Sequence, residues 1–594
     1  MKQFFKMFFA SLLAMVVTGV IILGLFIGVI VNLVSKASNA DGENKLKANS
    51  VLVVDLGKRL HEQGESNSLA AFSADISYNA GLYDALKAID HAKGDNNIKG
   101  ILVKLEPSPN GWATMQQLRA GLVDFKKSGK FLYAYGEDIT QGGYYIASAA
   151  DSVFLNPVGG FELKGFATVI PFFKGSLEKL ELKPEIFYAG KFKSATEPFR
   201  AEKISDPNRA QITRYLQGFW SEFLLAAVQH THSDTATIAQ LANTGAVQFP
   251  ADAVRYKLVD GLRYWDEVEH DLRSKTGTAE KDKIEYISMD EYTENVKRDR
   301  KLNDKKIAVL IAEGSIVDGE QNNDYEIASE TLVDNIRKLA KNDKVKAVVL
   351  RVNSPGGSAL ASEVILRELQ LLRKKKPLIV SMGDYAASGG YYISCQADSI
   401  FAMSNTITGS IGVFSMMFST EDLMKNKLGV TFDNVKTGPY ADFPTGVRTL
   451  TADEGQRVQN SVDTIYHIFK SRVAEGRKMD IALVDSFAQG RVWTGSDALD
   501  RHLVDGIGGL DRAIKSAAAM AKVSDYQVIT FPEPMDKFES LLRKFKGNTA
   551  AAAAVQATLQ SELGEEYEWY RQLKDLRKMN GKAMMQLPYH ISVK

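Results

Sequence analysis

Short apolar runs rich in β-branched residues recur along the chain and alternate with amphipathic stretches. Four of them have the length and composition of buried parallel strands, namely Val51–Leu56, Ile98–Leu105, Ile307–Ala312 and Val345–Val352. Between such runs lie segments like Ala359–Leu372, whose apolar side chains recur at helical spacing. Strands that alternate with helices predict an α/β fold with right-handed crossovers.

One apolar stretch is too long for a strand. Phe8–Val34 carries no charge over 27 residues, more than the roughly 20 needed to cross a bilayer as a helix. Lys2 and Lys6 precede it, which favours a cytoplasmic N-terminus. A cleavable signal ending near Ala40 is the competing interpretation, but its apolar core would exceed the usual length. We therefore expect a membrane anchor at residues 1–44, with everything after it outside the cytoplasm.

The chain also repeats itself. Gly142–Phe154 reads GGYYIASAADSVF and returns 247 positions later as GGYYISCQADSIF at Gly389–Phe401. Asn97–Leu105 resembles Lys344–Val352 at the same spacing, and the LVDG at 258–261 recurs at 503–506. Three matches in the same order at nearly constant spacing indicate a duplicated domain.

The repeat divides the chain into four parts. After the anchor, we expect an N-terminal repeat at 45–300 and a C-terminal repeat at 301–530. The composition changes beyond them, because Asp536–Asn580 is helix-forming and contains a run of alanines. Residues 531–594 are therefore predicted to be a helical tail for packing or oligomerisation.

Composition and charge exclude several functional classes. The 594 residues carry 73 Lys+Arg against 72 Asp+Glu, and a net charge of +1 does not indicate a nucleic-acid partner. One cysteine, Cys395, excludes a disulfide framework and any metal site built from several cysteines. No G-x-G-x-x-G follows a strand and no phosphate-binding P-loop motif is present, so we expect no cofactor and no metal.

The two halves differ at a turn that follows a predicted strand. The C-terminal half has Asn353–Ser358, NSPGGS, where the N-terminal half has Glu106–Gly111, EPSPNG. In such a turn, Gly356 and Gly357 can direct bare backbone N–H groups at an incoming oxygen. That arrangement suits an oxyanion hole.

Candidate catalytic residues are also divided between the halves. Ser410 lies between glycines in TGSIGV, and the matching part of the first half contains no serine. Conversely, Lys193 aligns with Ala441 in the second half, at a spacing of 248. A buried lysine whose pKa falls toward neutrality can take a proton from a serine hydroxyl. Complementary loss after duplication thus predicts one composite site, although Lys191 is a rival base on the residues alone.

At these residues the chain resembles the bacterial protease IV family, the long duplicated form of signal peptide peptidase A. The resemblance rests on four motifs: RVNSPGGS (Arg351–Ser358), ASGGYYIS (Ala387–Ser394), TGSIGV (Thr408–Val413) and GKFKSATEPF (Gly190–Phe199). It extends from the anchor to about residue 530.

The resemblance implies a Clp protease/crotonase-like fold, a β-β-α superhelix, in each repeat. It implies Ser410 as the nucleophile and Lys193, rather than Lys191, as the general base, with Gly356 and Gly357 at the oxyanion hole. It further implies a membrane-anchored serine endopeptidase that degrades cleaved signal peptides and similar apolar peptides. Such a protein would form a homotetramer on the inner membrane, with its catalytic domains on the periplasmic side.

Other functions explain less of the sequence. Ser176-x-x-Lys179 and a Lys-Thr-Gly at 275–277 match motifs of penicillin-interacting enzymes, but that class leaves the duplication unexplained. An acyl-CoA enzyme of the same fold needs no Ser–Lys pair. A catalytically inactive, membrane-anchored scaffold is the remaining alternative, and it has no reason to retain Ser410, Lys193 and the two glycines together.

Overall fold

The computed structural model describes residues 6–7, 13–15, 17–19, 46–66, 78–298, 303–321, 325–534 and 581–587. The predicted anchor, apart from a few positions, and the predicted tail helix at Asp536–Asn580 lie outside these ranges. Among the residues that are described, no helix has the length and apolar character required to span a bilayer.

The first repeat is built on a parallel sheet in the order β8-β6-β5-β4-β1-β9. Its strands, in chain order, are β1 (Ser50–Asp55), β4 (Ile98–Lys104), β5 (Phe131–Gly136), β6 (Ser152–Leu155), β8 (Gly261–Leu262) and β9 (Tyr286–Ser288). The side chains of β1 and β4 are largely buried, as their apolar sequences predicted.

The second repeat has the same strand order, β20-β16-β15-β13-β10-β21. These strands are β10 (Lys306–Glu313), β13 (Val345–Ser354), β15 (Leu378–Ala387), β16 (Ser399–Ala402), β20 (Gly506–Ile507) and β21 (Gln527–Phe531). Two further strands, β17 (Ile407–Gly409) and β19 (Val492–Thr494), continue the sheet beyond β15. The duplicated α/β architecture expected from the sequence is confirmed.

Matching helices accompany the two sheets. The predicted helix at Ala359–Leu372 is α13 (Ala359–Arg373), which begins where the Ser358 hydroxyl accepts a hydrogen bond from the Ala361 amide. Its equivalent in the first repeat is α3 (Trp112–Lys126). Short helices α4 (Gln141–Ala147) and α14 (Gly389–Ser394) and long helices α7 (Asp206–Thr231) and α15 (Ala452–Arg477) form two further pairs.

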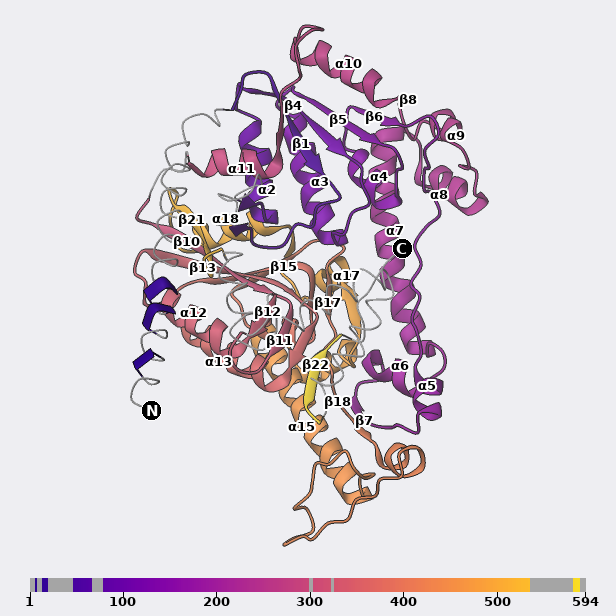
Figure 1. The fold of residues 1–594 in the computed structure, drawn as a ribbon, viewed down its shortest axis with the longest axis vertical. Coiled ribbons are helices and arrows are strands. Elements are labelled where there is room, and N and C mark those ends of the chain that lie inside the picture. Colours follow the sequence, from indigo (N-terminus) through magenta and orange to yellow (C-terminus); the bar gives the residue numbers. More distant parts are fainter. Residues whose placement is uncertain are drawn as a thin grey trace.

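A third sheet joins the repeats, in the order β12-β11-β14-β22-β18-β7. Its strands are β7 (Lys183–Ala189), β11 (Ser315–Val317), β12 (Glu326–Ala328), β14 (Gly356–Ser358), β18 (Val413–Ser419) and β22 (Ala583–Gln586). β7 of the first repeat pairs antiparallel with β18 of the second along the whole length of both strands (Figure 1). The first repeat thus donates a strand to the second.

The tail contributes one element to this sheet. β22, at the yellow end of the colour scale in Figure 1, lies between β14 and β18. These four residues were expected to be helical, and they form a strand because β14 and β18 offer backbone partners on both sides.

A buried ion pair also connects the two repeats. The Arg351 guanidinium on β13 donates from Nε to Glu62 Oε2 at 2.7 Å and from Nη2 to Glu62 Oε1 at 3.2 Å, and both side chains are almost fully buried. Burial raises the pKa of the Glu62 carboxyl, and the facing guanidinium opposes that effect. The pair therefore holds a segment of the first repeat against the central sheet of the second.

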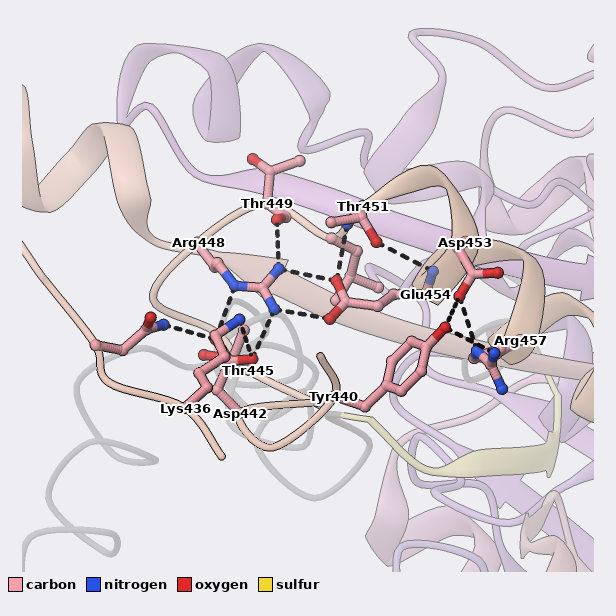
Figure 2. A network of polar contacts seen from close by, with 12 residues as sticks. Lys436, Tyr440, Asp442, Thr445, Arg448, Thr449, Thr451, Asp453, Glu454 and Arg457 are labelled. Atoms are coloured by element: carbon pink, nitrogen blue, oxygen red, sulfur yellow. Dashed lines mark hydrogen bonds and ion pairs between the residues drawn. The ribbon is translucent and has the colours of Figure 1, made fainter. Parts of the chain in front are cut away.

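The loop that precedes α15 is fixed by a polar network (Figure 2). The Arg448 guanidinium donates to both oxygens of Asp442, at 2.9 Å each, and to both oxygens of Glu454, at 2.7 and 2.8 Å. Arg448 lowers the pKa of Glu454 to about 2. This loop carries Ala441, the counterpart of Lys193 in the repeat, as an exposed residue.

Candidate active site

The turn after β7 brings Lys193 to the second repeat. Gly190 opens the turn with φ at 101°, a conformation that favours glycine. The Phe192 amide then donates to the Gln489 carbonyl at 2.8 Å, and the Lys193 amide donates to the Gly190 carbonyl at 3.0 Å. Because the bond to Gln489 ties the turn to the second repeat, the Lys193 side chain enters the interface between the halves.

Lys193 meets two serines there. Its Nζ lies 3.1 Å from Ser410 Oγ and 2.8 Å from Ser388 Oγ, and it donates to the Ser410 carbonyl oxygen at 3.3 Å. All three residues are at most 1% exposed. The structure therefore brings together the lysine and the serine that the sequence singled out, and it adds a second hydroxyl.

Burial alone gives Lys193 the properties of a base. Desolvation lowers its pKa to about 7, because taking the ammonium out of water disfavours the charged form. A large fraction of Lys193 is then neutral at neutral pH and holds a lone pair that can accept a proton.

Ser410 lies between β17 and β18 in a left-handed conformation, with φ at 51°. Its backbone amide donates to the Arg491 carbonyl at 2.7 Å. Both its hydroxyl and its carbonyl face Lys193 Nζ. Ser410 therefore contacts the Lys193 amine through both its hydroxyl and its carbonyl oxygen.

Ser388 occupies a sharp turn from β15 into α14. Its φ of 54° and ψ of −112° are strained for a residue with a side chain. The Ser388 amide donates to the Gly409 carbonyl at 2.8 Å, which fixes the turn beside the end of β17, directly before Ser410. A strained strand-to-helix turn that exposes a serine hydroxyl to a base is a recurrent geometry of serine nucleophiles.

Sequence reasoning missed Ser388, although a signal was available. Ser388 lies inside the ASGGYYIS motif (Ala387–Ser394), but the block that the two halves share begins one residue later, at Gly389. At the same spacing of 247, position 388 corresponds to Gln141, so Ser388 is another residue that only the second half possesses.

The two glycines predicted for the oxyanion hole have different surroundings. The Gly356 amide donates to Ser354 Oγ at 3.1 Å, and φ of Gly356 is 101°. Gly357 instead pairs in register with Met585 of β22. A Cβ atom on Gly356 would lie 2.0 Å from the Met585 carbonyl oxygen and 2.8 Å from the Gly389 amide. The Met585 carbonyl oxygen thus lies in the space between the backbones of Gly356 and Gly389.

Gln211 on α7 ties the base to the second repeat. Its Nε2 donates to the Phe192 carbonyl at 3.2 Å, and its Oε1 accepts from the Val492 amide at 3.1 Å. One buried side chain, that of Gln211, therefore holds both Phe192, the residue before Lys193, and strand β19.

Rival candidates lie elsewhere. Lys191 is exposed and its Nζ lies over the Phe192 ring, 5.3 Å from the centroid. Ser176 and Lys275 are exposed on separate helices. Burial raises the pKa of the Cys395 thiol to about 12, which makes it a poor nucleophile. In the part of the chain that the structure describes, no cluster of His, Cys, Asp and Glu could hold a metal ion.

Comparison with protein families gives two matches. The model described as peptidase family S49 matches residues 124–279 and 370–524, one segment in each repeat. The model described as Clp protease matches residues 298–408 of the second repeat.

Three curated proteins are similar along most of their length. "Protease 4" of Salmonella typhi is 35% identical over 531 residues, 86% of this chain and 84% of that one. "Protease 4" of Haemophilus influenzae is 34% identical, covering 87% of each chain. "Serine protease SPPA, chloroplastic" of Arabidopsis thaliana is 31% identical, covering 88% of this chain and 76% of that one.

Proposed function

The chain belongs to peptidase family S49 and is a serine peptidase, in which we propose that Lys193 is the general base and Ser388 the nucleophile. Ser410, the nucleophile expected from the sequence, then positions the lysine. The observation that supports this assignment is the placement of Lys193 Nζ between two hydroxyls, with the shorter distance, 2.8 Å, to Ser388.

The proton inventory of a neutral amine is compatible with the same assignment. Such an amine has two N–H groups and one lone pair. The Ser410 carbonyl can only accept, so it takes one N–H. In the proposed assignment the second N–H goes to the Ser410 hydroxyl, which is 3.1 Å away. The lone pair is left for the Ser388 hydroxyl, whose proton it can remove.

The backbone around Ser388 is suited to stabilise an oxyanion. Gly389 is the first residue of α14, so its amide has no acceptor within the helix. A Cβ atom on Gly389 would lie 3.0 Å from the Met585 carbonyl oxygen and 3.1 Å from the Gly357 amide. We assign the oxyanion donors to Gly357 and Gly389, in place of the expected pair Gly356 and Gly357.

Catalysis then follows the acyl-transfer course of serine peptidases. Ser388 Oγ attacks the scissile carbonyl carbon while Lys193 takes its proton. Lys193 returns that proton to the leaving amine as the peptide bond breaks and an ester to Ser388 forms. A water molecule, deprotonated by Lys193, hydrolyses the ester, and Ser388 recovers a proton.

Apolar peptides, including cleaved signal peptides, are the proposed substrates. Beside β18, an apolar cluster of Leu177, Phe199, Phe414 and Met416 packs around Met584, a side chain of the extended strand β22. A relative from Enterococcus faecium, 35% identical over 240 residues, carries the name "Putative signal peptide peptidase SppA". The name supports the same substrate class for this chain.

We further propose that Phe8–Val34 anchors the protein in the inner membrane, with both repeats on the periplasmic side. The support is the uncharged run of 27 residues with lysines before it. Labelling of single cysteines introduced before and after this run, in intact cells, tests the orientation.

A homotetramer completes the proposal. By the repeat spacing of 248, the counterpart of β7 in the second repeat is residues 431–437. There Phe432 and Val435 are exposed rather than paired, which suits contact with another copy of the chain. Native mass spectrometry of the detergent-solubilised protein tests the subunit number.

The catalytic assignment is tested with single variants on a fluorogenic apolar peptide. Ser388→Ala and Lys193→Ala should each lower kcat by about 10⁴-fold or more, because a dyad fails when either member is lost. Lys191→Ala, which removes an exposed lysine two residues from the base, is the matched control and should retain activity.

Other outcomes revise the proposal in defined ways. Full activity of Ser388→Ala together with complete loss in Ser410→Ala would make Ser410 the nucleophile and keep Lys193 as the base. An absence of turnover by the unmodified chain would instead favour the inactive scaffold.

A further inference from the structure

Glu197 is a buried carboxylate four residues after the proposed base. It is 3% exposed and is the first residue of the short helix α6 (Glu197–Arg200). Its partners in the described part of the chain are uncharged donors. The Ser205 hydroxyl donates to Oε1, and the Ser205 amide and Asn208 Nδ2 donate to Oε2 at 3.4 and 2.8 Å. A buried carboxylate is tolerated only where such donors surround it, so Glu197 and these two residues fix one another.

Both donors belong to the start of α7. Ser205 is the N-cap of this helix, and Asn208 lies in its first turn. The positive end of the helix dipole adds to the attraction for a carboxylate there. Glu197 therefore determines where the first turn of α7 lies relative to the segment that follows Lys193.

Asn208 passes this placement on to Gln211, one turn further along α7. Gln211 Nε2 lies 2.9 Å from Asn208 Oδ1. The same nitrogen lies 3.1 Å from Ser194 Oγ and 3.2 Å from the Phe192 carbonyl oxygen. These two acceptors belong to the residues directly before and after Lys193. The backbone of the base is therefore held on both sides.

The other end of the Gln211 amide reaches the segment that contacts the base. Its Oε1 accepts from a backbone amide of β19 at 3.1 Å. Arg491, directly before that strand, accepts at its carbonyl from the Ser410 amide at 2.7 Å. One chain of hydrogen bonds thus holds both Lys193 and the serine that Lys193 contacts.

The repeat without the base lacks this chain of amides. α7 and α15 have 26 residues each and begin 246 positions apart. At that spacing, Asn208 corresponds to Glu454 and Gln211 to Arg457. Glu454 instead pairs with Arg448 in the ionic network of Figure 2. Because the same helix forms without the amides in the second repeat, the fold of the repeat does not require them.

We propose that Glu197 is a positioning residue for the general base and acts through Asn208 and Gln211. The inference rests on the proposed function, since it takes Lys193 to be the base. Among the described residues, the Lys193 amine bonds only to Ser388 and Ser410, so Glu197 acts on it through the backbone. A fixed backbone keeps the amine aligned with the serines and out of water.

Peptide hydrolysis at a series of pH values tests the proposal. Glu197→Leu removes the acceptors and leaves an apolar side chain in a buried place. We expect kcat to fall about 100-fold and KM to stay within about threefold, because a base displaced by about 1 Å is misaligned while peptide binding is unaffected. The acidic limb of the profile should move upward by about one pH unit or more, because a loosened amine regains water. Partial unfolding would lower kcat and leave the limb in place, so an unmoved limb would overturn the proposal.

Two further variants test the route through Gln211. Glu197→Gln keeps an acceptor for Asn208 and should restore kcat to within about threefold of the natural chain. The double variant Glu197→Leu/Gln211→Leu should be no slower than Gln211→Leu alone, since both changes break one chain. Multiplied effects in the double variant would overturn the proposal.

A matched control separates positioning from lost stability. Glu454→Leu removes a carboxylate of similar burial from the same end of the counterpart helix. We expect it to lower the stability to urea and to leave the acidic limb of the profile in place. A limb that moves as far as in Glu197→Leu would overturn the proposal.

Labelling of Lys193 by acetic anhydride distinguishes this proposal from the proposed function, because it follows the neutral amine without turnover. In Ser388→Ala, mass spectrometry should give a labelling midpoint near pH 7. The midpoint should rise by about one pH unit or more when Glu197→Leu is added. A midpoint that moves in a protein whose natural chain hydrolyses no peptide would end the proposed function and leave the positioning role. Hydrolysis by the natural chain together with an unmoved midpoint would end the positioning role and leave the peptidase.

Discussion

Gly490 lies against the backbone of Lys193 so closely that a Cβ atom on Gly490 would be 2.7 Å from both the Cβ and the amide nitrogen of the lysine. The same glycine donates its amide to the Ile411 carbonyl at 2.7 Å, one residue after Ser410. The absence of a side chain at Gly490 therefore sets the distance between Lys193 and the segment that contains Ser410 and Ile411.

Replacing Gly490 by alanine should displace the base. We expect Gly490→Ala to lower kcat by about 100-fold, since a shift on the order of 1 Å in a catalytic group has that effect. Gly429→Ala is the matched control, because Gly429 has a similar positive φ, 67° against 72°, but open space around it. Both variants then carry the same backbone strain, and equal kcat values would contradict the predicted role of Gly490.

The activity should depend on pH through Lys193. Its pKa of about 7 means that the lysine is protonated, and cannot act as a base, at lower pH. We expect kcat/KM to rise with pH and to level off above neutrality, with one acidic limb near pH 7. A limb near pH 10 would show that the lysine is not desolvated in the working enzyme.

Loss of the Ser410 hydroxyl should change the pKa of Lys193 rather than prevent the nucleophilic attack by Ser388. In Ser410→Ala the ammonium form of Lys193 loses a hydrogen-bond partner, so the pKa of the lysine should fall further. We expect kcat to decrease by roughly 10- to 100-fold and the acidic limb of the pH profile to move to lower pH. Ser410→Thr, which keeps a hydroxyl, should restore the limb toward its original position.

Burying a lysine without a carboxylate partner lowers stability. Between pH 7 and about pH 10.4 the unfolded state binds more protons than the folded state, because only the folded state holds Lys193 neutral. Stability of the natural chain therefore rises with pH across this window. Lys193→Met should be more stable at pH 7, by on the order of 4 kcal/mol in urea denaturation, with the difference closing near pH 10. A constant difference at both pH values would indicate that packing alone is responsible.

The buried ion pair between the repeats should be costly to break. Glu62→Ala leaves the charge of Arg351 without its partner, and we expect the free energy of unfolding to fall by about 3–5 kcal/mol. Lys515→Ala breaks the exposed pair with Asp511 and should change it by less than about 0.5 kcal/mol. Equal effects in the two variants would mean that the repeats do not depend on the Glu62–Arg351 contact.

The sequence was sufficient for the features that repeat or that follow a period. Val345–Val352 and Ala359–Leu372 lie within β13 and α13, because burial on both faces of a strand and on one face of a helix leaves a readable pattern. The asymmetry between the halves led to Lys193 and Ser410, whose side chains do meet.

Two features could not be predicted from repeats or periodicity, for physical reasons. Ser388 lies in a turn whose strain is visible only in its dihedral angles. The residues that both halves share, GGYY, begin directly after Ser388, so the repeat does not include it. Strand β22 is four residues long, too short for a pattern, and its partners are more than 160 residues away in sequence. Non-local pairing of this kind is determined by the edges that are available rather than by propensity.

The donated strand β7 also places the proposed base and the proposed nucleophile far apart in the order of synthesis. Lys193 and Ser388 are separated by 195 residues, so a ribosome adding about 5–20 residues per second makes the base roughly 10–40 s before the serine. Until the second repeat has folded around β7, Lys193 is neither buried nor in contact with Ser388. If Lys193 and Ser388 act together as proposed, proteolytic activity therefore requires that both copies of the domain have been completed.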